Sequence, residues 1–398
     1  MIDADSFIDG AISSGFSFFT GVPCSYLSPL INRVISRRDS EYVGATSEGE
    51  AVAIAAGAWL GGRQTVVMCQ NSGLGNAVNP LTSLNYPFRI PTLLIATWRG
   101  KPGETDEPQH LLMGRITEAL LKLVDIPAVP FPASITEVGP ALQNARERMA
   151  ASGLPFAMIM SRDTVDASTL QDTDFATRLH KGTCTDLSTG MAKPSRQAAL
   201  ERMLSIVPDD TAVIATTGKC GRELFTLQDR KQHIYQVGSM GAASAMALGV
   251  SLTTVRPVLV IDGDGAALMK LGNLATIGAR GPSNLVHLLL DNGVHDSTGG
   301  QATVSASVDF AGIALSCGYK SAWRCSDLPG LETAIGEAFR SDGPTMIHMR
   351  ITPGSMKNLG RPTLAPCEVA LRFKDFLQEP VAQSDKHSTG STTLVSAS

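Results

Sequence analysis

The sequence predicts an α/β protein built from two doubly wound parallel-sheet domains, and three observations support this. First, short apolar runs of strand length alternate with helical patterns through residues 1–165. Second, the same alternation begins again at residue 194 and continues to residue 380. Third, residues 166–193 between them are rich in Thr, Ser, Asp and Gly, which is typical of a linker. Strands alternating with helices favour a parallel sheet in each domain.

The expected strands follow from the apolar runs, and helical patterns occupy the stretches between them. In the first domain these runs are 16–20, 41–46, 65–70, 91–98 and 155–161. In the second domain they are 212–216, 234–237, 258–261, 285–290, 321–324 and 345–351. The last residues, 381–398, are rich in Ser and Thr and have almost no core-forming side chains. We expect them to be a disordered tail.

The composition argues against several classes of protein. The chain has 398 residues and a net charge of -4, which offers no positively charged footprint for nucleic acid or an anionic membrane. The acidic N-terminus lacks the pattern of a signal peptide, and no apolar run reaches the length of a membrane span. The seven cysteines form no CxxC pair, so we expect reduced thiols in a cytoplasmic protein, with neither a zinc site nor disulfides.

The strongest local signal lies where two strands of the second domain end. The run 258–261 stops at DGDG, residues 262–265, and the run 285–290 stops at DNG, residues 291–293. Ligands of open α/β sheets bind at that edge of the sheet. Asp264 offers a carboxylate and Asn292 an amide oxygen, a set that suits Mg²⁺ carrying a diphosphate. A lone GDG would indicate only a tight turn, whereas the strand-helix-strand frame and the Asn favour a metal site.

This motif resembles the cofactor anchor of the thiamine diphosphate enzymes, because Gly263, Asp264 and Gly265 are separated from Asn292 by twenty-six residues. The resemblance implies a pyrimidine-binding domain in residues 1–165 and a diphosphate-binding domain in residues 194–380, with no central third domain. It also implies thiamine diphosphate and Mg²⁺ as cofactors. Asp264, Asn292 and the main-chain carbonyl of Val294 would hold the metal.

Two further segments match the family's cofactor-binding pattern. TSEGEA, residues 46–51, opens an alanine-rich helix, and the resemblance implies that Glu48 bonds N1′ of the aminopyrimidine. Glu50 is the alternative residue, and a helix start in which both acids favour the helix dipole is the structural alternative.

VGSMG, residues 237–241, is the other matching segment. The resemblance implies that Gly238 and Ser239 contact the cofactor, with the Gly238 carbonyl accepting from its 4′-amino group. Met240 would hold the cofactor in a bent shape, although a Met in this position is more often core filler.

Substrate contacts are expected from two loops of the first domain. Residues 70–76, QNSGLGN, lie between a strand and a helix and expose main-chain amides to an anion. Asn71, Gly75 and Asn76 are the candidates there.

The second loop contains WRGKPG, residues 98–103, and DEPQH, residues 106–110. Both segments closely resemble those of the phosphonopyruvate decarboxylase family. Arg99 and Lys101 are candidates for binding the substrate anion. His110 is the candidate general acid or base, although a loop His is usually a surface residue.

Three other features leave alternatives open. Lys219 and Arg222 follow a strand and could meet the substrate anion or the cofactor diphosphate, or simply begin a solvated helix. Residues 295–298 are expected to form a loop over the diphosphate. The segment GVPCS has Cys24 where the family usually has Asp, and this marks a subgroup or a shifted substrate preference.

The family resemblance implies a lyase that decarboxylates 3-phosphonopyruvate, non-oxidatively, to phosphonoacetaldehyde and CO₂ in phosphonate and antibiotic biosynthesis. The alternative substrate is sulfopyruvate or another short 2-oxo acid, because phosphonate and sulfonate are both tetrahedral oxyanions. An alternative from another class is a non-catalytic α/β protein that binds Mg²⁺ and a nucleotide. The family's two domains meet across subunits, which implies a homodimer or higher homo-oligomer with sites between subunits.

Overall fold

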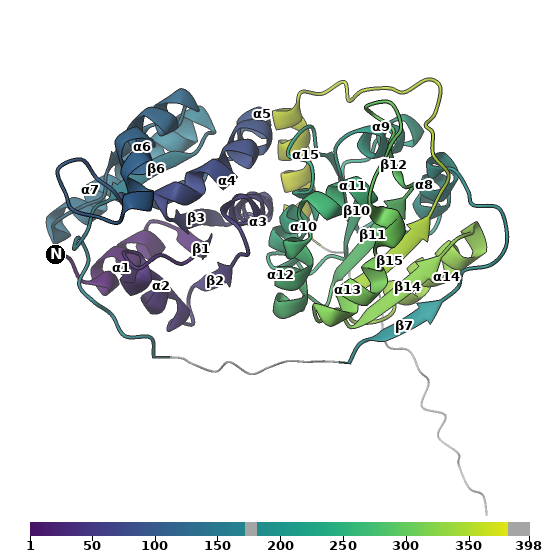
Figure 1. The fold of residues 1–398 in the computed structure, drawn as a ribbon, viewed down its shortest axis with the longest axis horizontal. Helices are drawn as coiled ribbons and strands as arrows, with labels where there is room; N and C mark the ends of the chain where they lie inside the picture. The colour runs from purple at the N-terminus through teal and green to yellow at the C-terminus, as the bar shows by residue number, and fades with distance from the viewer. Residues whose placement is uncertain (172–180, 381–398) are drawn as a thin grey trace, which may run out of the picture.

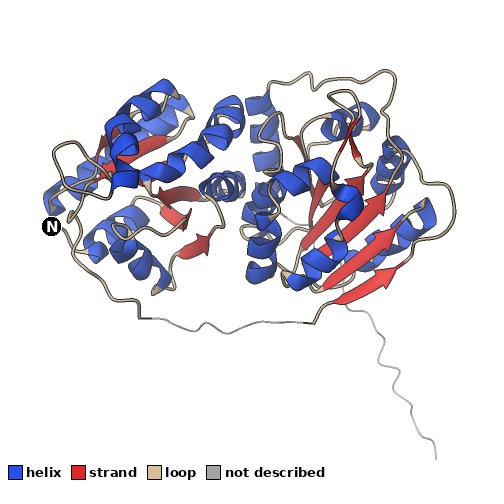
Figure 2. Ribbon diagram, in the orientation of Figure 1, coloured by secondary structure: helices blue, strands red, loops and turns tan. Residues whose placement is uncertain are grey.

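The computed structural model describes residues 1–171 and 181–380 as two α/β domains that face one another (Figure 1). The expected disordered tail, 381–398, and part of the expected linker, 172–180, lie outside the described residues. Helices lie on both sides of each sheet (Figure 2), which confirms the doubly wound α/β class. Across the two described ranges, no helix combines the length and the apolar character that a bilayer crossing needs.

The first domain holds a six-stranded sheet in which every neighbouring pair is parallel. Its strands, in spatial order, are β2 (Glu41–Gly44), β1 (Phe16–Gly21), β3 (Gln64–Cys69), β4 (Leu93–Thr97), β6 (Phe156–Met160) and β5 (Ala128–Pro130). The inner strands are buried on both faces, which is why they read as continuous apolar runs. All five expected strands are confirmed, whereas β5 was not predicted because it is short and mostly exposed.

The helices of the first domain are α1 (Ala4–Ser13), α2 (Ser28–Ile35), α3 (Glu48–Leu60), α4 (Leu74–Pro80), α5 (Tyr86–Phe88), α6 (Leu111–Leu123) and α7 (Ile135–Ser152). Short turns of 3-10 or π-helix extend three of them: η1 (Asn71–Gly73), η2 (Leu81–Asn85) and η3 (Pro108–His110).

The second domain holds a seven-stranded sheet, again parallel throughout. Its strands, in spatial order, are β7 (Thr183–Asp186), β14 (Ser321–Cys325), β15 (Thr345–Arg350), β11 (Leu285–Asp291), β10 (Val258–Gly263), β8 (Ala212–Ala215) and β9 (His233–Tyr235). The six expected strands are confirmed. Strand β7 lies inside the segment expected to be linker, and its four exposed residues carry no apolar pattern that would predict it.

The remaining elements of the second domain are the hairpin β12 (Val294–His295) and β13 (Gln301–Ala302), the turn η4 (Ser305–Ser307), and eight helices. These helices are α8 (Arg196–Leu204), α9 (Lys219–Leu227), α10 (Ala243–Ser251), α11 (Asp264–Met269), α12 (Gly272–Arg280), α13 (Phe310–Ser316), α14 (Leu328–Ala338) and α15 (Pro366–Gln378).

Helix α3 of the first domain packs against helix α10 of the second, and the two helices face each other at the domain junction in Figure 1. Every residue of both helices is buried, as expected for helices that are apolar on all sides. Their backbones approach closely, because a Cβ at Gly57 would collide with the Met246 carbonyl and one at Gly249 with the Ile54 carbonyl. The Lys270 side chain lies beside both Gly49 at the start of α3 and Gly241 before α10, so the start of α3, which carries Glu48, lies close to the loop before α10.

Candidate active site

A cavity of about 270 Å³ opens at the carboxyl edge of the second sheet, where β10 and β11 end. Six of the expected cofactor residues line it: Met240, Gly263, Asp264, Gly265, Asn292 and Val294. The hairpin that follows β11 covers one side, with the His295 ring close to Gly265. The structure therefore brings together the residues that the GDG motif predicted.

The expected metal ligands have the chemistry that Mg²⁺ requires. Asp264 is buried, and one carboxylate oxygen accepts a hydrogen bond from Thr303. Burial raises the pKa of the Asp264 carboxyl, so a cation beside it would relieve the cost of the buried charge. The described residues hold no group of three or more His, Cys, Asp or Glu side chains arranged for a metal. One carboxylate, one amide and one main-chain carbonyl nevertheless fit a Mg²⁺ that also takes diphosphate oxygens.

A buried hydrogen-bond network holds Asn292 in place. Its Nδ2 donates to Asp296 Oδ2 at 2.6 Å, and Arg196 Nη2 donates to the same oxygen at 2.6 Å. Arg196 also bonds Glu223 Oε1 at 3.1 Å. The Asn292 Oδ1 accepts from the Val294 backbone amide at 3.2 Å, and its second lone pair is left for a ligand. Sequence analysis did not single out Arg196, because its partners lie far along the chain and no motif surrounds it.

Replacing Arg196 with Met is expected to lower the free energy of unfolding by about 3 to 5 kcal/mol. The reason is that the buried carboxylate of Glu223 and the partly buried carboxylate of Asp296 would lose their counter-charge. Urea denaturation measures the effect. Arg202→Met on the same helix is the matched control, because Arg202 and Glu332 form an exposed pair and should contribute less than about 1 kcal/mol. Equal effects of the two changes would contradict the role given to the buried network.

The loop before α10 lies at the domain junction, as its expected cofactor role requires. Ser239 adopts a left-handed backbone conformation, with φ of 54°, and its hydroxyl donates to the Asn79 carbonyl of the first domain at 3.2 Å. Gly238 has no room for a side chain, because a Cβ would lie 2.6 Å from the Ser83 carbonyl oxygen. Met240, which follows Ser239, lines the cofactor cavity. Contacts with both domains hold this loop in one conformation.

The two acidic residues at the start of α3 have different hydrogen-bond partners. Glu50 Oε2 accepts from the Thr46 backbone amide and hydroxyl, at 2.5 and 2.6 Å, whereas its Oε1 is buried without a hydrogen-bond partner among the described residues. Glu48 accepts only from Asn76 Nδ2 among the described residues, at 2.8 Å. Gly73 leaves room for the Glu48 carboxylate, since a Cβ there would collide with it. Each acid thus keeps one carboxylate oxygen without a hydrogen-bond partner among the described residues, and the Glu48 carboxylate is the one that lies beside the 70–76 loop.

The residues expected to bind substrate in the 70–76 loop have different surroundings. Asn71 is buried and joins this loop to the next one, donating to the Arg99 carbonyl at 2.8 Å and to Thr117 Oγ1 at 2.9 Å. Gly75 is exposed, and Asn76 bonds Glu48. Asn71 and Asn76 therefore position other groups in this structure.

The two cations expected to bind the substrate anion are already paired with carboxylates. Arg99 donates from two nitrogens to Asp106, at 2.8 and 2.6 Å, and lies over the Tyr26 ring. Lys101 lies 2.9 Å from Glu104 and bonds Ser161. These pairs fold the 99–107 loop upon itself and reduce the positive charge that the loop offers to a substrate.

Replacing Asp106 with Asn is expected to lower the free energy of unfolding by about 2 kcal/mol at neutral pH. Hydrogen bonds from Arg99 hold the pKa of the Asp106 carboxyl well below its usual range. Such a group stabilises the fold above its unfolded pKa of about 4, and the contribution is lost as the pH falls through the folded value. The wild type and the variant should therefore converge in acid, measured by urea denaturation across pH. Glu107→Gln, at an exposed neighbour, is the control and should show no such pH dependence.

His110 and Cys24 lie at the carboxyl edge of the first sheet or in the loops beyond it. His110 is buried, and its Nδ1 has no hydrogen-bond partner among the described residues. The Cys24 thiol donates to Gln70 Oε1 at 3.3 Å, so it holds the start of the 70–76 loop. Arg222 donates to the carbonyls of Leu359 and Gly360, and so serves a segment near the C-terminus.

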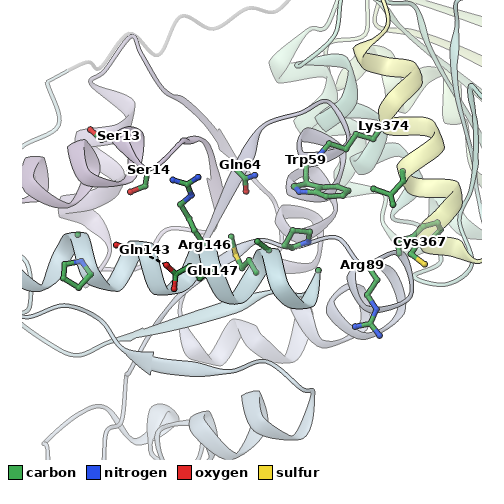
Figure 3. Close-up of a pocket in the computed structure, with 18 residues that line it drawn as sticks. Ser13, Ser14, Trp59, Gln64, Arg89, Gln143, Arg146, Glu147, Cys367 and Lys374 are labelled. Atoms are coloured by element: carbon green, nitrogen blue, oxygen red, sulfur yellow. Dashed lines mark hydrogen bonds between the residues drawn. The ribbon is translucent and has the colours of Figure 1, made fainter.

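A larger cavity, about 1060 Å³, lies away from this site, between α7 and α15 (Figure 3). It contains none of the expected site residues. The Lys374 ammonium lies 3.7 Å from the centroid of the Trp59 ring at one end, and Arg146 and Glu147 line its middle. Its size alone does not make it the catalytic centre.

Two family models match the chain, one in each of the two sheet-containing halves. Residues 4–119 match the family described as thiamine pyrophosphate enzyme, N-terminal TPP binding domain, and residues 216–349 match the corresponding C-terminal TPP binding domain. A benzoylformate decarboxylase from Polynucleobacter necessarius has a similar fold, with a TM-score of 0.67 and 14% identity over 90% of this chain and 100% of that one. The fold and its two domains define a thiamine diphosphate enzyme.

Closer relatives narrow the family. A phosphonopyruvate decarboxylase of Streptomyces viridochromogenes is 51% identical over 96% of both chains, and one of Streptomyces hygroscopicus is 50% identical over 96% of this chain and 95% of that one. A sulfopyruvate decarboxylase of Methanosarcina acetivorans is 29% identical over 92% of this chain and 95% of that one. The chain belongs to the phosphonopyruvate decarboxylase family.

Proposed function

We propose that this enzyme converts 3-phosphonopyruvate to phosphonoacetaldehyde and CO₂, with thiamine diphosphate and Mg²⁺ as cofactors, as a step of phosphonate biosynthesis. The observation that supports the proposal is that two half-sites lie close together. One half-site is Glu48 of the first domain, and the other is the cavity of Asp264 and Asn292 in the second domain. The Ser239 hydroxyl of the 238–240 loop donates to Asn79 of α4, the helix whose Asn76 bonds Glu48, and that loop leads into the cavity of Asp264 and Asn292. Identity of about half over nearly the whole chain favours this substrate over sulfopyruvate.

Each group of residues has one task in this proposal. Thiamine diphosphate, when bound, supplies the sink for the electrons that CO₂ leaves behind. Asp264, Asn292 and the Val294 carbonyl would hold Mg²⁺ and the diphosphate. Gly238, Ser239 and Met240 would orient the other end of the cofactor.

Two residues of the first domain, Glu48 and His110, would transfer protons in this reaction. Glu48 would hold a proton between its free carboxylate oxygen and the aminopyrimidine, since Asn76 engages the other oxygen. His110 is the candidate proton donor to the product, because its buried Nδ1 lacks a partner among the described residues.

The test is CO₂ release by the purified protein with thiamine diphosphate and Mg²⁺, supplied in parallel with phosphonopyruvate, sulfopyruvate and pyruvate. We expect preference for phosphonopyruvate and loss of activity when the cofactor is omitted. Preference for sulfopyruvate would change the assigned substrate but would still support a thiamine diphosphate-dependent decarboxylase. Cofactor binding without CO₂ release from any of the three would overturn the decarboxylase.

We further propose a homo-oligomer with sites between subunits. In the described chain, the half-sites of the first and second domains meet within a single copy, so the arrangement needs a direct test. Glu48→Gln and Asp264→Asn each damage a different half. Recovery of activity on mixing the two inactive variants is the expected result for sites between subunits, and no recovery would mean that each chain completes its own site.

A further inference from the structure

The proposed substrate carries a phosphonate that pyruvate lacks, and the site must supply positive charge for it. Arg99 and Lys101 are paired within their own loop with Asp106 and Glu104. Arg196, in the cofactor cavity, is paired with Glu223 and Asp296. A dianion therefore requires cations other than these three to achieve specific recognition.

A second cavity, of about 420 Å³, adjoins the cofactor cavity and shares Thr217 and Gly218 with it. The Thr217 hydroxyl donates to the Val237 carbonyl at 3.1 Å, so the shared wall is tied to the loop that contains Gly238. Val237 itself lines the second cavity and is 48% exposed, although it is a large apolar residue. The second cavity therefore lies next to the cofactor cavity, beside the loop that contains Gly238.

The segment 351–365 runs from β15 to α15 (Figure 1), and its residues Arg361, Pro362 and Leu364 line the second cavity. Three contacts hold it at Gly360. Arg222 donates to the Gly360 carbonyl at 3.1 Å, the Gly360 amide donates to Thr226 Oγ1 at 2.9 Å, and the Phe225 ring lies within 3.2 Å of where a Cβ at Gly360 would be. The next residue, Arg361, lines the cavity. Arg222 is thus a positioning residue for Arg361.

Lys219 and Arg361 differ from the three paired cations. Lys219 lines the cofactor cavity and Arg361 the second cavity, on either side of the shared residues Thr217 and Gly218. Within residues 1–171 and 181–380, neither side chain forms an ion pair or hydrogen bond. Their positive charge is therefore available to a ligand.

We propose that Lys219 and Arg361 bind the phosphonate of the substrate at the junction of the two cavities and so determine the preference for phosphonopyruvate over pyruvate. This inference rests on the proposed decarboxylase function and goes beyond it by moving substrate recognition to the second domain. Arg361 supplies a forked pair of donors and Lys219 a point charge, a combination suited to a tetrahedral dianion.

The test compares Lys219→Met, Arg361→Met and the double variant in the holoenzyme. Each single change should lower the ratio of kcat/KM for phosphonopyruvate to that for pyruvate by about ten- to a hundred-fold, and the double change should lower it further. Binding of 3-phosphonopropionate, measured by calorimetry, should weaken in parallel. Thiamine diphosphate affinity should stay within a few-fold of wild type, and Lys219→Arg should retain most of the preference. Lys320→Met, a distant exposed lysine, is the matched control.

Two results would overturn the inference alone. One is an unchanged preference ratio in both single variants, with Lys101→Met lowering it instead. The other is a loss of thiamine diphosphate affinity in Lys219→Met as large as the loss of phosphonopropionate binding, which would assign Lys219 to the cofactor diphosphate. Failure of the wild type to decarboxylate phosphonopyruvate is a distinct result, because it removes the proposed function together with this inference.

Discussion

Replacing Glu48 with Gln is expected to lower kcat by about 10² to 10⁴-fold, the range that general acid–base groups contribute. The amide keeps the size of the side chain and its contact with Asn76, but it cannot exchange a proton as a carboxyl group does. Binding of thiamine diphosphate with Mg²⁺ should change far less, because the metal ligands belong to the other domain. CO₂ release and calorimetric titration of the cofactor measure the two effects separately.

Glu50→Gln is the matched control for Glu48, two residues further along the same helix. Its carboxylate caps the helix start through two hydrogen bonds from Thr46, so its loss should appear as about 1.5 to 3 kcal/mol of unfolding free energy. Turnover should fall much less than in the Glu48 variant. If Glu50→Gln removed turnover and Glu48→Gln retained it, the roles assigned to the two acids would be reversed.

The residues that could be predicted from sequence are those whose function is set by local order. Asp264 and Asn292 each follow a buried parallel strand, and parallel strands bring their carboxyl ends to one edge, so spacing alone places both at one cavity. The strands themselves are visible because burial on both faces makes them continuous apolar runs. Strand β7, whose residues Thr183–Asp186 are all exposed, carries no such pattern.

Side chains whose role depends on a distant partner could not be assigned in this way. Arg196 bonds Asp296, one hundred residues away, and nothing in the local sequence indicates that contact. The loop of Arg99 shows the opposite difficulty, because its cations are visible but their pairing with Asp106 and Glu104 depends on how the loop folds. The sequence therefore predicted the position of the cofactor better than the position of the substrate's charged group.

Replacing Asp264 with Asn is expected to have opposite effects on cofactor binding and on stability. Loss of the carboxylate should weaken binding of Mg²⁺ and thiamine diphosphate by at least about a hundred-fold, since changes to residues that merely support a metal ligand already cost 10- to 100-fold. Calorimetric titration of the cofactor with Mg²⁺ measures this loss. Activity should fall correspondingly at cofactor concentrations that saturate the wild type.

The stability of the cofactor-free protein should instead rise by about 1 kcal/mol at neutral pH in the Asp264→Asn variant. Burial raises the pKa of Asp264, so the folded protein bears the cost of an ionised carboxylate at any pH above that raised value. The cost disappears as the pH falls below it, and the two proteins should then unfold alike. Thermal unfolding with and without Mg²⁺ tests the sign, because the metal should stabilise only the wild type. A variant that is less stable without metal at neutral pH, or that still gains stability from Mg²⁺, would show that Asp264 serves the fold and not the cofactor.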